Sequence, residues 1–537
     1  MDCRALSFSQ LPHQPKIVLD YLEHFDRVAK FYEHPPSIKL LPKVAKKIEY
    51  PAERRKAVAA ILRKQNEQFG GGAAAVENLA RFDRGAMAIV SGQQVGLFSG
   101  PAYAVYKALT AIQIAEELTR AGVDAIPVFW MATEDHDLDE VRHSTWFENG
   151  RLRRFELLAE ANSAQPVGRV FLGPEVEKAA GEAADSLANE GSDFLAHILR
   201  ESYRAHETYG SAFGKLFARL FAEQGLILMD PLDAGLHRVT APLYQRALIE
   251  RDALNEKLQE RGKQLDKVGY AAQVKVTAKS TLLFYMGNGS RQVVSSSGGK
   301  FQAGENSWSK EEITALGGSQ PENFSANALL RPVVQDYLLP TVAYVGGPAE
   351  IAYFAQSEVI YKELLGRMTV MLPRAGFTLV DAKAAKLLKR YQLEVEDVWG
   401  GPQEVRARME CKSVPTNLAK QFEKDQKEIK KILEQLEKQV TKLDATLKGS
   451  VGTARKKINY QLEKLRRKTG RAQDEKDKLI AGHKEYLESL LHPHKALQSR
   501  ELSLLPFLAR WGTGGLGELQ KLCTGKKMGS HFICQVQ

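Results

Sequence analysis

The chain contains 537 residues, of which 44% are hydrophobic and 26% are charged, and its 42 glycines and 21 prolines are close to average. This composition indicates a globular protein of roughly two to four domains and excludes a disordered, collagen-like or fibrous chain. Apolar stretches such as 125–132 are far shorter than the roughly 18 residues of a membrane span. No apolar segment follows the first residues as it would in a signal peptide. We therefore expect a cytoplasmic protein without a membrane partner.

The four cysteines, Cys3, Cys411, Cys523 and Cys534, are far apart and form no C-x-x-C pair. Disulfide frameworks and cysteine zinc sites usually show closely or regularly spaced cysteines. The spacing therefore predicts neither of them and is typical of a protein in a reducing compartment.

Strand-like apolar runs alternate with amphipathic helices over residues 1–400, which predicts an α/β fold with a Rossmann-like parallel sheet. The expected strands are 86–90, 126–131, 226–229, 341–345 and 369–372, and a helix opening at Pro101 connects the first two. Small connective insertions, partly β-rich, are expected at about 141–200 and 270–325. They would interrupt the catalytic core without changing its sheet.

A glycine-rich segment, 91–101, stands between the first strand and the first helix of this core. Glycines at Gly92, Gly96 and Gly100 would let backbone N–H groups approach an anion at the helix N-terminus. The segment is neither a Walker A sequence nor G-x-G-x-x-G. A phosphate-binding loop and a tight structural turn are therefore equally compatible with it.

Four charged residues, Glu134, Asp135, His136 and Asp137, follow the second strand directly. They are expected at the carboxyl edge of the sheet, where ligand sites of α/β proteins form. An extended backbone would turn Glu134 and His136 to one side and the two aspartates to the other. The group could transfer protons or hold a divalent metal ion; an acidic loop that caps the next helix is the alternative.

A third cluster lies around Arg331, between residues 327 and 353. Pro332 disfavours helix at the residue before it, so Arg331 is expected on a strand or loop edge. Charged side chains among apolar neighbours should be paired or functional. An ion pair between Arg331 and Asp336 is the structural alternative to a binding role, and the sequence 346–348 predicts a strand-to-helix turn.

Near the C-terminus, apolar residues recur with the alternating four- and three-residue spacing of a coiled coil at Ile429, Leu433, Leu436, Val440, Leu443 and Leu447. A weaker seam runs from Ala454 to Leu490, and the glycines in 448–452 predict a turn between the two. We expect an antiparallel coiled-coil hairpin over 415–490, followed by a segment, 491–537, that returns to the core. The formal net charge is +10, and 418–490 carries 19 Lys and Arg against 12 Asp and Glu.

Four ordered strings, 91–103, 127–137, 330–336 and 344–350, resemble the BshC family of bacillithiol biosynthesis, the cysteine-adding enzymes. The resemblance extends from about Phe8 to Leu519, and the tail after Lys521 lies outside it. It implies a ligase that forms an amide bond by adding L-cysteine to glucosaminyl malate in the last step of bacillithiol biosynthesis. It also implies a core similar to that of class I aminoacyl-tRNA synthetases and a coiled coil that mediates a homodimer.

The chain departs from the synthetases in its nucleotide motifs, because it has neither their His-containing phosphate motif nor a Lys-Met-Ser-Lys-Ser loop. ATP use is therefore argued from thermodynamics and fold analogy. Joining a carboxylate to an amine in water is uphill, so the carboxyl group of cysteine has to be activated. ATP, accompanied by Mg²⁺, is the cofactor that this route calls for.

The resemblance and the three clusters together give the following assignments. The catalytic residues are Glu134, Asp135, His136 and Asp137. The substrate-binding residues are Gln93, Gln94, Tyr103, Asn327, Arg331, Gln335, Asp336, Tyr344 and Glu350. The cofactor-binding residues are Ser91, Gly92, Gly100, Lys107, Gly346 and Gly347, and no residue is assigned as a metal ligand.

Two other functions are compatible with parts of the sequence. The basic hairpin, with Arg455–Lys457 and Arg466–Lys468, could bind nucleic acid such as tRNA, but it has few aromatic residues and its carboxylates are interleaved. A solvated coiled-coil face accounts for it better, so no nucleic-acid partner is expected. A metal-dependent hydrolase built on Glu134–Asp137 is the third hypothesis.

Overall fold

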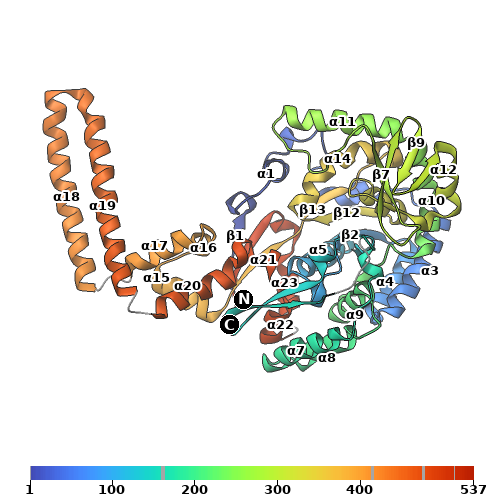
Figure 1. Ribbon diagram of the computed structural model, residues 1–537, viewed down its shortest axis with the longest axis horizontal. Helices are drawn as coiled ribbons and strands as arrows, with labels where there is room; N and C mark the ends of the chain where they lie inside the picture. The colour runs from blue at the N-terminus through green and yellow to red at the C-terminus, as the bar shows by residue number, and fades with distance from the viewer. Residues whose placement is uncertain (1, 159–163, 413–415, 475–477, 513, 537) are drawn as a thin grey trace.

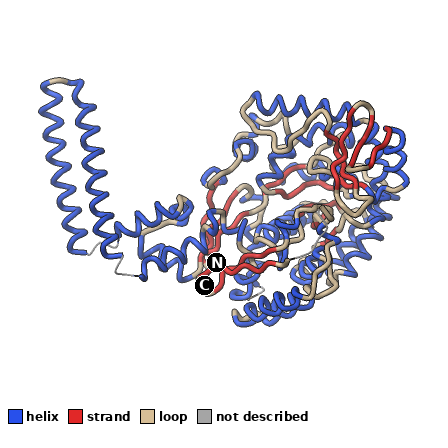
Figure 2. Tube along the Cα trace, in the orientation of Figure 1, coloured by secondary structure: helices blue, strands red, loops and turns tan. Residues whose placement is uncertain are grey.

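A five-stranded parallel sheet forms the centre of the larger part of the molecule (Figures 1 and 2). This computed structural model describes residues 2–158, 164–412, 416–474, 478–512 and 514–536. The sheet consists of β2 (Met87–Gln93), β3 (Ala125–Met131), β6 (Ile227–Met229), β12 (Thr341–Gly346) and β13 (Val370–Pro373). These strands coincide with the five apolar runs, so the predicted Rossmann-like α/β fold is confirmed.

The order of the strands determines where a ligand site can form. In space they run β13-β12-β2-β3-β6, and all neighbours are parallel. From β2 the chain adds β3 and β6 on one side, whereas β12 and β13 are added on the other side. The order therefore reverses between β2 and β12, and in open parallel sheets ligands bind outside the carboxyl ends of the strands at such a switch point.

Helices α5 (Tyr103–Arg120) and α14 (Pro348–Leu365) cover opposite faces of the sheet. Successive residues of a strand point to opposite faces. Accordingly, Val90 belongs to the same apolar core as Phe354 of α14, whereas its neighbour Ile89 packs with Ile114 of α5. Both helices follow directly on strands at the switch point, α5 on β2 and α14 on β12, so both begin at the carboxyl edge.

Two β-structures are inserted between strands of the central sheet. The first is the hairpin of β4 (His143–Glu148) and β5 (Arg151–Glu156), which precedes helices α7 (Glu175–Asn189) and α8 (Asp193–Ser202). The second is an antiparallel sheet of β7 (Ser280–Tyr285), β8 (Gln292–Ser297), β9 (Lys300–Ala303), β10 (Asn306–Ser309) and β11 (Phe324–Ala326). The loops of this second sheet reach the carboxyl edge of the central sheet, where residues 291 and 326 line a cavity.

A long helical hairpin of α18 (Thr416–Leu443) and α19 (Lys448–Asp474) projects away from the rest of the molecule (Figure 1). The predicted antiparallel coiled coil is therefore present, but the predicted position of its turn is wrong. The turn lies at 444–447, where the Asp444 side chain accepts the Thr446 N–H at 2.8 Å, and the glycines of 448–452 lie in the first turns of α19. An Asp side chain that bonds to its own backbone two residues on is a strong turn former.

The second predicted seam is not continuous with the hairpin. Its last residues belong to α20 (Lys478–Leu491), in which Leu487 and Leu490 are fully buried. The Tyr486 hydroxyl donates to Asp381 at 2.5 Å, which ties α20 to the body of the protein rather than to α18. Among the described helices, none is both long enough and apolar enough to cross a membrane.

Strands near the two ends of the sequence pair in a further sheet, which the sequence analysis did not predict. Strand β15 (Ser530–Gln535) lies between β1 (Asp2–Ser7) and β14 (Gly376–Val380). Cys3 and Cys534 face each other across β1 and β15 and form a disulfide. The expectation of reduced cysteines without disulfides is therefore wrong for this pair, because their separation in sequence concealed their pairing in the sheet; Cys523 is a buried free thiol.

Candidate functional site at the switch point of the sheet

A cavity of about 600 Å³ lies at the carboxyl edge of the sheet, outside β2 and β12. This is the size and position expected of a small-molecule site in an α/β fold. Most of the predicted site residues line it: Gly92, Gln93, Gln94, Tyr103, Lys107, Glu134, Asp135, Asn327, Arg331, Tyr344, Gly347 and Glu350. The others, Ser91, Gly100, His136, Asp137, Gln335, Asp336 and Gly346, are not among its lining residues.

Lys107 and Glu350 form a buried ion pair beside the cavity. The Lys107 ammonium lies 2.5 Å from a Glu350 oxygen and donates to the Gly92 carbonyl at 2.7 Å and to the Gln93 side chain at 2.8 Å. The other Glu350 oxygen accepts the Tyr344 hydroxyl at 2.5 Å. Burial lowers the pKa of Lys107. Burial also acts to raise the pKa of Glu350, but the ion pair with Lys107, together with hydrogen bonds from the Gly347 N–H and the Tyr344 hydroxyl, lowers that pKa overall. Because all three ammonium protons have acceptors, Lys107 links β2 to α14 and keeps no free N–H for a phosphate.

The strand end of the glycine-rich segment is shaped by close backbone packing. A Cβ on Gly92 would lie 2.6 Å from the Trp130 carbonyl oxygen of β3, so only glycine fits there. The Ser91 hydroxyl donates to the Val345 carbonyl of β12 at 2.8 Å. Ser91 therefore connects two strands, and Gly92 exposes backbone to the cavity.

The loop that follows, 95–100, is a packed structural turn. All its residues are buried, and Phe98, at φ 48°, packs its ring 4.9 Å from that of Tyr203. Gly100 has φ 63°, and a Cβ on Gly96 would lie 2.8 Å from the Gly100 Cα. The glycines are thus required by the turn itself, which favours the structural alternative over a phosphate loop for this part.

The four residues of the acidic cluster, 134–137, do not all belong to the cavity. The backbone here is not extended, because the Asp135 N–H donates to the Ala132 carbonyl at 3.3 Å and closes a turn, so the facing expected for an extended backbone does not apply. Glu134 and Asp135 consequently both line the cavity. His136 and Asp137 are exposed, and Asp137 caps the short helix α6 (Leu138–Val141) by accepting the Glu140 N–H at 3.2 Å. Within the described ranges, no group of three or more His, Cys, Asp or Glu side chains is placed to hold a metal ion.

Glu134 is the buried carboxyl group of the cavity, with 7% of the residue exposed. One of its oxygens lies 3.4 Å from Nε2 of His237, in helix α10 (Ala234–Ile249). Burial raises the pKa of Glu134 to about 8, against the opposing effect of Arg291, and burial lowers the pKa of His237 to about 4. A carboxyl group that titrates close to neutral pH in a cavity is suited to exchange a proton with a substrate.

Gln94 holds the two other carboxylates on this side of the cavity. Its amide donates to Asp135 at 3.1 Å and to Glu140 at 2.6 Å. Burial also raises the pKa of Glu140. Gln94 therefore positions acidic side chains and has both amide protons engaged.

Arg331 also lines the cavity, and its local structure differs from the prediction. It is the first residue of helix α13 (Arg331–Leu338), because proline at the second position tolerates a helix start. Its guanidinium donates to the Tyr353 hydroxyl at 2.9 Å and to the Gln335 side chain at 3.3 Å. No carboxylate of the described residues forms an ion pair with it, and the proposed partner Asp336 instead accepts the Tyr361 hydroxyl at 2.8 Å.

Among the other predicted residues of this cluster, Asn327 and Gly347 line the cavity, whereas Gln335, Asp336 and Gly346 do not. Gln335 and Asp336 are buried residues of α13 itself, and the Gln335 amide donates to Asp336 at 3.0 Å. The Asn327 side chain accepts the N–H groups of Leu329 and Leu330, both at 3.0 Å, and so fixes the turn before α13. The Gly346 carbonyl accepts the Arg374 N–H at 2.9 Å, and Gly347 precedes α14.

Sequence reasoning missed three arginines that line the cavity, Arg291, Arg374 and Arg500. Arg374 directly follows β13, just as Glu134 closely follows β3. Its position after a core strand could therefore have identified it from the sequence. Arg291 comes from the connection of β7 and β8, and Arg500 from the short helix α21 (Gln498–Glu501). Both are brought to the cavity by segments whose placement no local sequence signal reveals.

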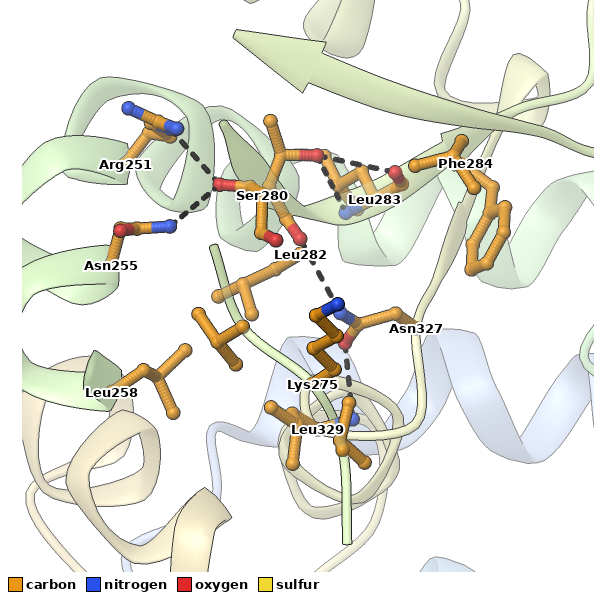
Figure 3. A pocket seen from close by; sticks show the side chains of 14 residues that line it. Arg251, Asn255, Leu258, Lys275, Ser280, Leu282, Leu283, Phe284, Asn327 and Leu329 are labelled. Carbon is orange, nitrogen blue, oxygen red and sulfur yellow. Dashed lines mark hydrogen bonds between the residues drawn. The ribbon is translucent and has the colours of Figure 1, made fainter. Parts of the chain in front are cut away.

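A smaller cavity, of about 130 Å³, shares Val274, Phe284 and Asn327 with the large one. Figure 3 shows its polar groups bonded to one another: Arg251 and Asn255 both donate to the Ser280 carbonyl, at 3.1 and 2.9 Å. Its other lining residues are largely aliphatic. Lys275 also lines this space, while Arg251 and Asn255 are engaged with backbone.

Comparisons with known proteins agree on one family. The family model described as the N-terminal Rossmann-like domain of bacillithiol biosynthesis BshC matches residues 1–375, and that of the C-terminal coiled-coil domain of BshC matches 377–535. The matches include β1 and β15, so the expectation that the tail after Lys521 lies outside the family is wrong.

Individual relatives align along almost the whole chain. A protein of Koribacter versatilis is 41% identical over 515 residues, covering 95% of both chains, and one of Solibacter usitatus is 37% identical, covering 95% of this chain and 96% of its own. A protein of Salinibacter ruber is 30% identical over 94% of both chains. All three carry the name "Putative cysteine ligase BshC". The chain described here therefore belongs to the BshC family of bacillithiol biosynthesis.

Proposed function

We propose that this protein is a ligase that forms an amide bond between the carboxyl group of L-cysteine and the amino group of glucosaminyl malate, completing bacillithiol. The observation that carries the proposal is the cavity at the switch point, which places Arg331, without a carboxylate partner among the described residues, in the same space as the buried carboxyl group of Glu134. The Arg331 guanidinium can bind an anionic substrate, and Glu134 can accept the proton that an attacking amine loses. The names of the relatives supply the identity of the amino acid.

Each part of the reaction has a candidate residue. The malate group carries two carboxylates, and the planar Arg331 guanidinium can hold one of them with two parallel hydrogen bonds. When the amine nitrogen attacks the cysteine carbonyl carbon, the nitrogen has to lose a proton, and Glu134 is the base that would accept it. Activation of the cysteine carboxyl by ATP, with Mg²⁺ as its counter-ion, would supply the driving force.

The test is a reconstitution with purified protein, L-cysteine, glucosaminyl malate, ATP and Mg²⁺. We expect mass spectrometry to detect a product whose mass equals that of the two substrates less one water, formed only when ATP is present. Chromatography of the nucleotides then distinguishes AMP from ADP as the product. Absence of the amide with all components present would contradict the proposal, as would a source organism that still makes bacillithiol after deletion of the gene.

We also propose that the hairpin mediates a homodimer. Leu433 and Val451 are buried between α18 and α19, whereas Leu436, Leu443 and Leu465 are 46%, 84% and 54% exposed. Apolar residues exposed along a coiled coil are typical of a surface that a second copy covers.

Deleting 416–474 and closing the gap with a short flexible linker should therefore convert a dimer into a monomer. The deletion ends before α20, because α20 packs on the body of the protein. Multi-angle light scattering gives the mass of each form, and the melting temperature of the body should change little. A monomeric full-length protein would show that the exposed apolar residues have another role.

A further inference from the structure

Two arginines of the cavity, Arg374 and Arg500, form no ion pair with a carboxylate of the described residues. Arg374 is 8% exposed and donates to the Ala375 carbonyl at 3.0 Å. Arg500 is exposed on α21 and lines the same cavity. Burial, together with the nearby positive charge of Arg500, lowers the pKa of Arg374 to about 10. The two guanidinium groups therefore add positive charge to one part of the cavity without forming an ion pair, although Glu350 acts on Arg374 and Arg500 acts on Glu140 from a greater distance.

Two other carboxylates of the cavity wall are already engaged with other groups. Glu350 is bonded to Lys107, Tyr344 and the Gly347 N–H. Glu140 accepts the amide of Gln94 at 2.6 Å. Burying a guanidinium without a counter-ion is costly, so an anion from outside the chain would stabilise this arrangement.

The loop after β2 leaves little room for an anion, whereas the region around Arg374 lies elsewhere along the same edge of the sheet. The loop after β2, where a Rossmann fold usually receives phosphate, is closed by its own packing, and Lys107 has no free proton. Arg374 lies on the other side of the switch point, next to the N-terminus of α14. A Cβ on Gly347 would lie 3.5 Å from a Glu350 carboxylate oxygen and 3.8 Å from Nε of Arg374, so a side chain there would touch both groups, whereas glycine does not.

We propose that Arg374, beside the N-terminus of α14, and Arg500, which lines the same cavity, form an oxyanion subsite distinct from Arg331. This subsite binds the phosphate chain of a nucleotide or the second carboxylate of the malate group. Both sources present several oxygens with negative charge, which guanidinium groups bind with paired hydrogen bonds. The inference rests on the proposed ligase function for the identity of these two sources. The presence of an anion subsite at this position rests on the geometry alone.

The test is direct binding, measured by isothermal titration calorimetry on the full-length protein, with pyrophosphate and malate as separate probes. Arg500→Gln is the main variant because Arg500 is exposed and its loss should not affect folding. Arg374→Gln is the second variant, with its melting temperature measured alongside. Arg238→Gln, at an exposed position of α10 outside the cavity, is the matched control for the loss of one positive charge.

We expect Arg500→Gln and Arg374→Gln each to weaken one probe by about tenfold, while Arg238→Gln leaves it unchanged. Weaker pyrophosphate binding assigns the subsite to the nucleotide, and weaker malate binding assigns it to the acceptor. Unchanged binding of both probes in Arg500→Gln, or no binding of either probe to the unmodified protein, would overturn the subsite. Because binding is measured without turnover, an inactive protein whose probe binding depends on Arg500 would refute the ligase proposal and leave the subsite standing.

Discussion

Replacing Glu134 by Gln is expected to lower the rate of amide formation by about 10²–10⁴-fold, the usual effect of losing one proton-transfer group. Glutamine has the same shape and keeps a hydrogen-bonding oxygen, so the fold and substrate binding should be retained. Steady-state kinetics with saturating substrates measures the loss in kcat. Asp139→Asn, at an exposed position of the same segment, is the matched control, because the Asp139 side chain lies outside the cavity and pairs with Arg142 at 3.1 Å.

The pH dependence gives this prediction a second readout. If Glu134 accepts the proton, it has to be ionised, and activity should rise as the pH passes through about 8, the pKa to which burial raises it. The Glu134→Gln variant should lack that limb of the profile. His136→Ala should lower the rate of amide formation less than Glu134→Gln does, because His136 lies outside the cavity. A larger loss of rate in His136→Ala would assign the catalytic role to His136.

Glu134 should also make the stability of the protein depend on pH. Its pKa is about 8 in the folded chain against the ordinary 4.5, so between these values the folded state holds a proton that the unfolded state has released. Stability contributed by this group is therefore lost as the pH rises from about 4.5 to about 8. Melting temperatures of the unmodified protein and of Glu134→Gln, measured across that range, should diverge, with the variant gaining relative stability at the higher pH. Parallel curves would show that the folded-state pKa is not raised.

Replacing Arg331 by Lys is expected to raise KM for glucosaminyl malate by about tenfold or more, equivalent to roughly 1.4 kcal/mol of binding. Lysine keeps the charge but loses the planar fork that holds a carboxylate with two hydrogen bonds. The hydrogen bond that Arg331 donates to Tyr353 would also be disturbed. KM for cysteine and for ATP should change little.

A purely structural role for Arg331 predicts a different pattern. In that case the variant melts at a lower temperature and all substrates are affected alike. Arg238→Lys, on an exposed helix face, controls for the substitution itself. Equal changes in all three KM values, or a large loss of thermal stability, would refute the malate assignment.

The sequence predicted the central sheet well because its strands are buried on both faces and appear as short apolar runs. Once those strands were known, the switch-point rule placed Glu134, Gln93 and Gly347 at one edge. The local backbone conformation was harder to predict than the sheet. Whether Glu134 and Asp135 face the same way depends on one hydrogen bond that closes a turn, and the helix start at Arg331 depends on the capping of the preceding turn by Asn327.

Side chains that reach the cavity from segments distant in sequence could not be predicted from the positions of the core strands. Arg500 reaches the cavity from the C-terminal region, more than a hundred residues after β13 in sequence, and Arg291 comes from the loop of an inserted sheet. Their positions depend on how these segments pack against the core. A single sequence carries no local pattern for such packing, whereas Arg374, directly after a core strand, could have been selected.

The sheet that joins the two ends of the chain affects how the protein can fold during synthesis. Strand β1 pairs with β15, and the disulfide partners Cys3 and Cys534 are separated by 531 residues in sequence. At ribosomal rates of roughly 5–20 residues per second, β1 leaves the ribosome about half a minute to two minutes before its partner strand exists. During that time the central parallel sheet can form, but β1 and β14 each have an unpaired edge. Strand β15 therefore completes both edges at once, so translation that stops before β15 would release a chain with two open strand edges, a structure prone to aggregate.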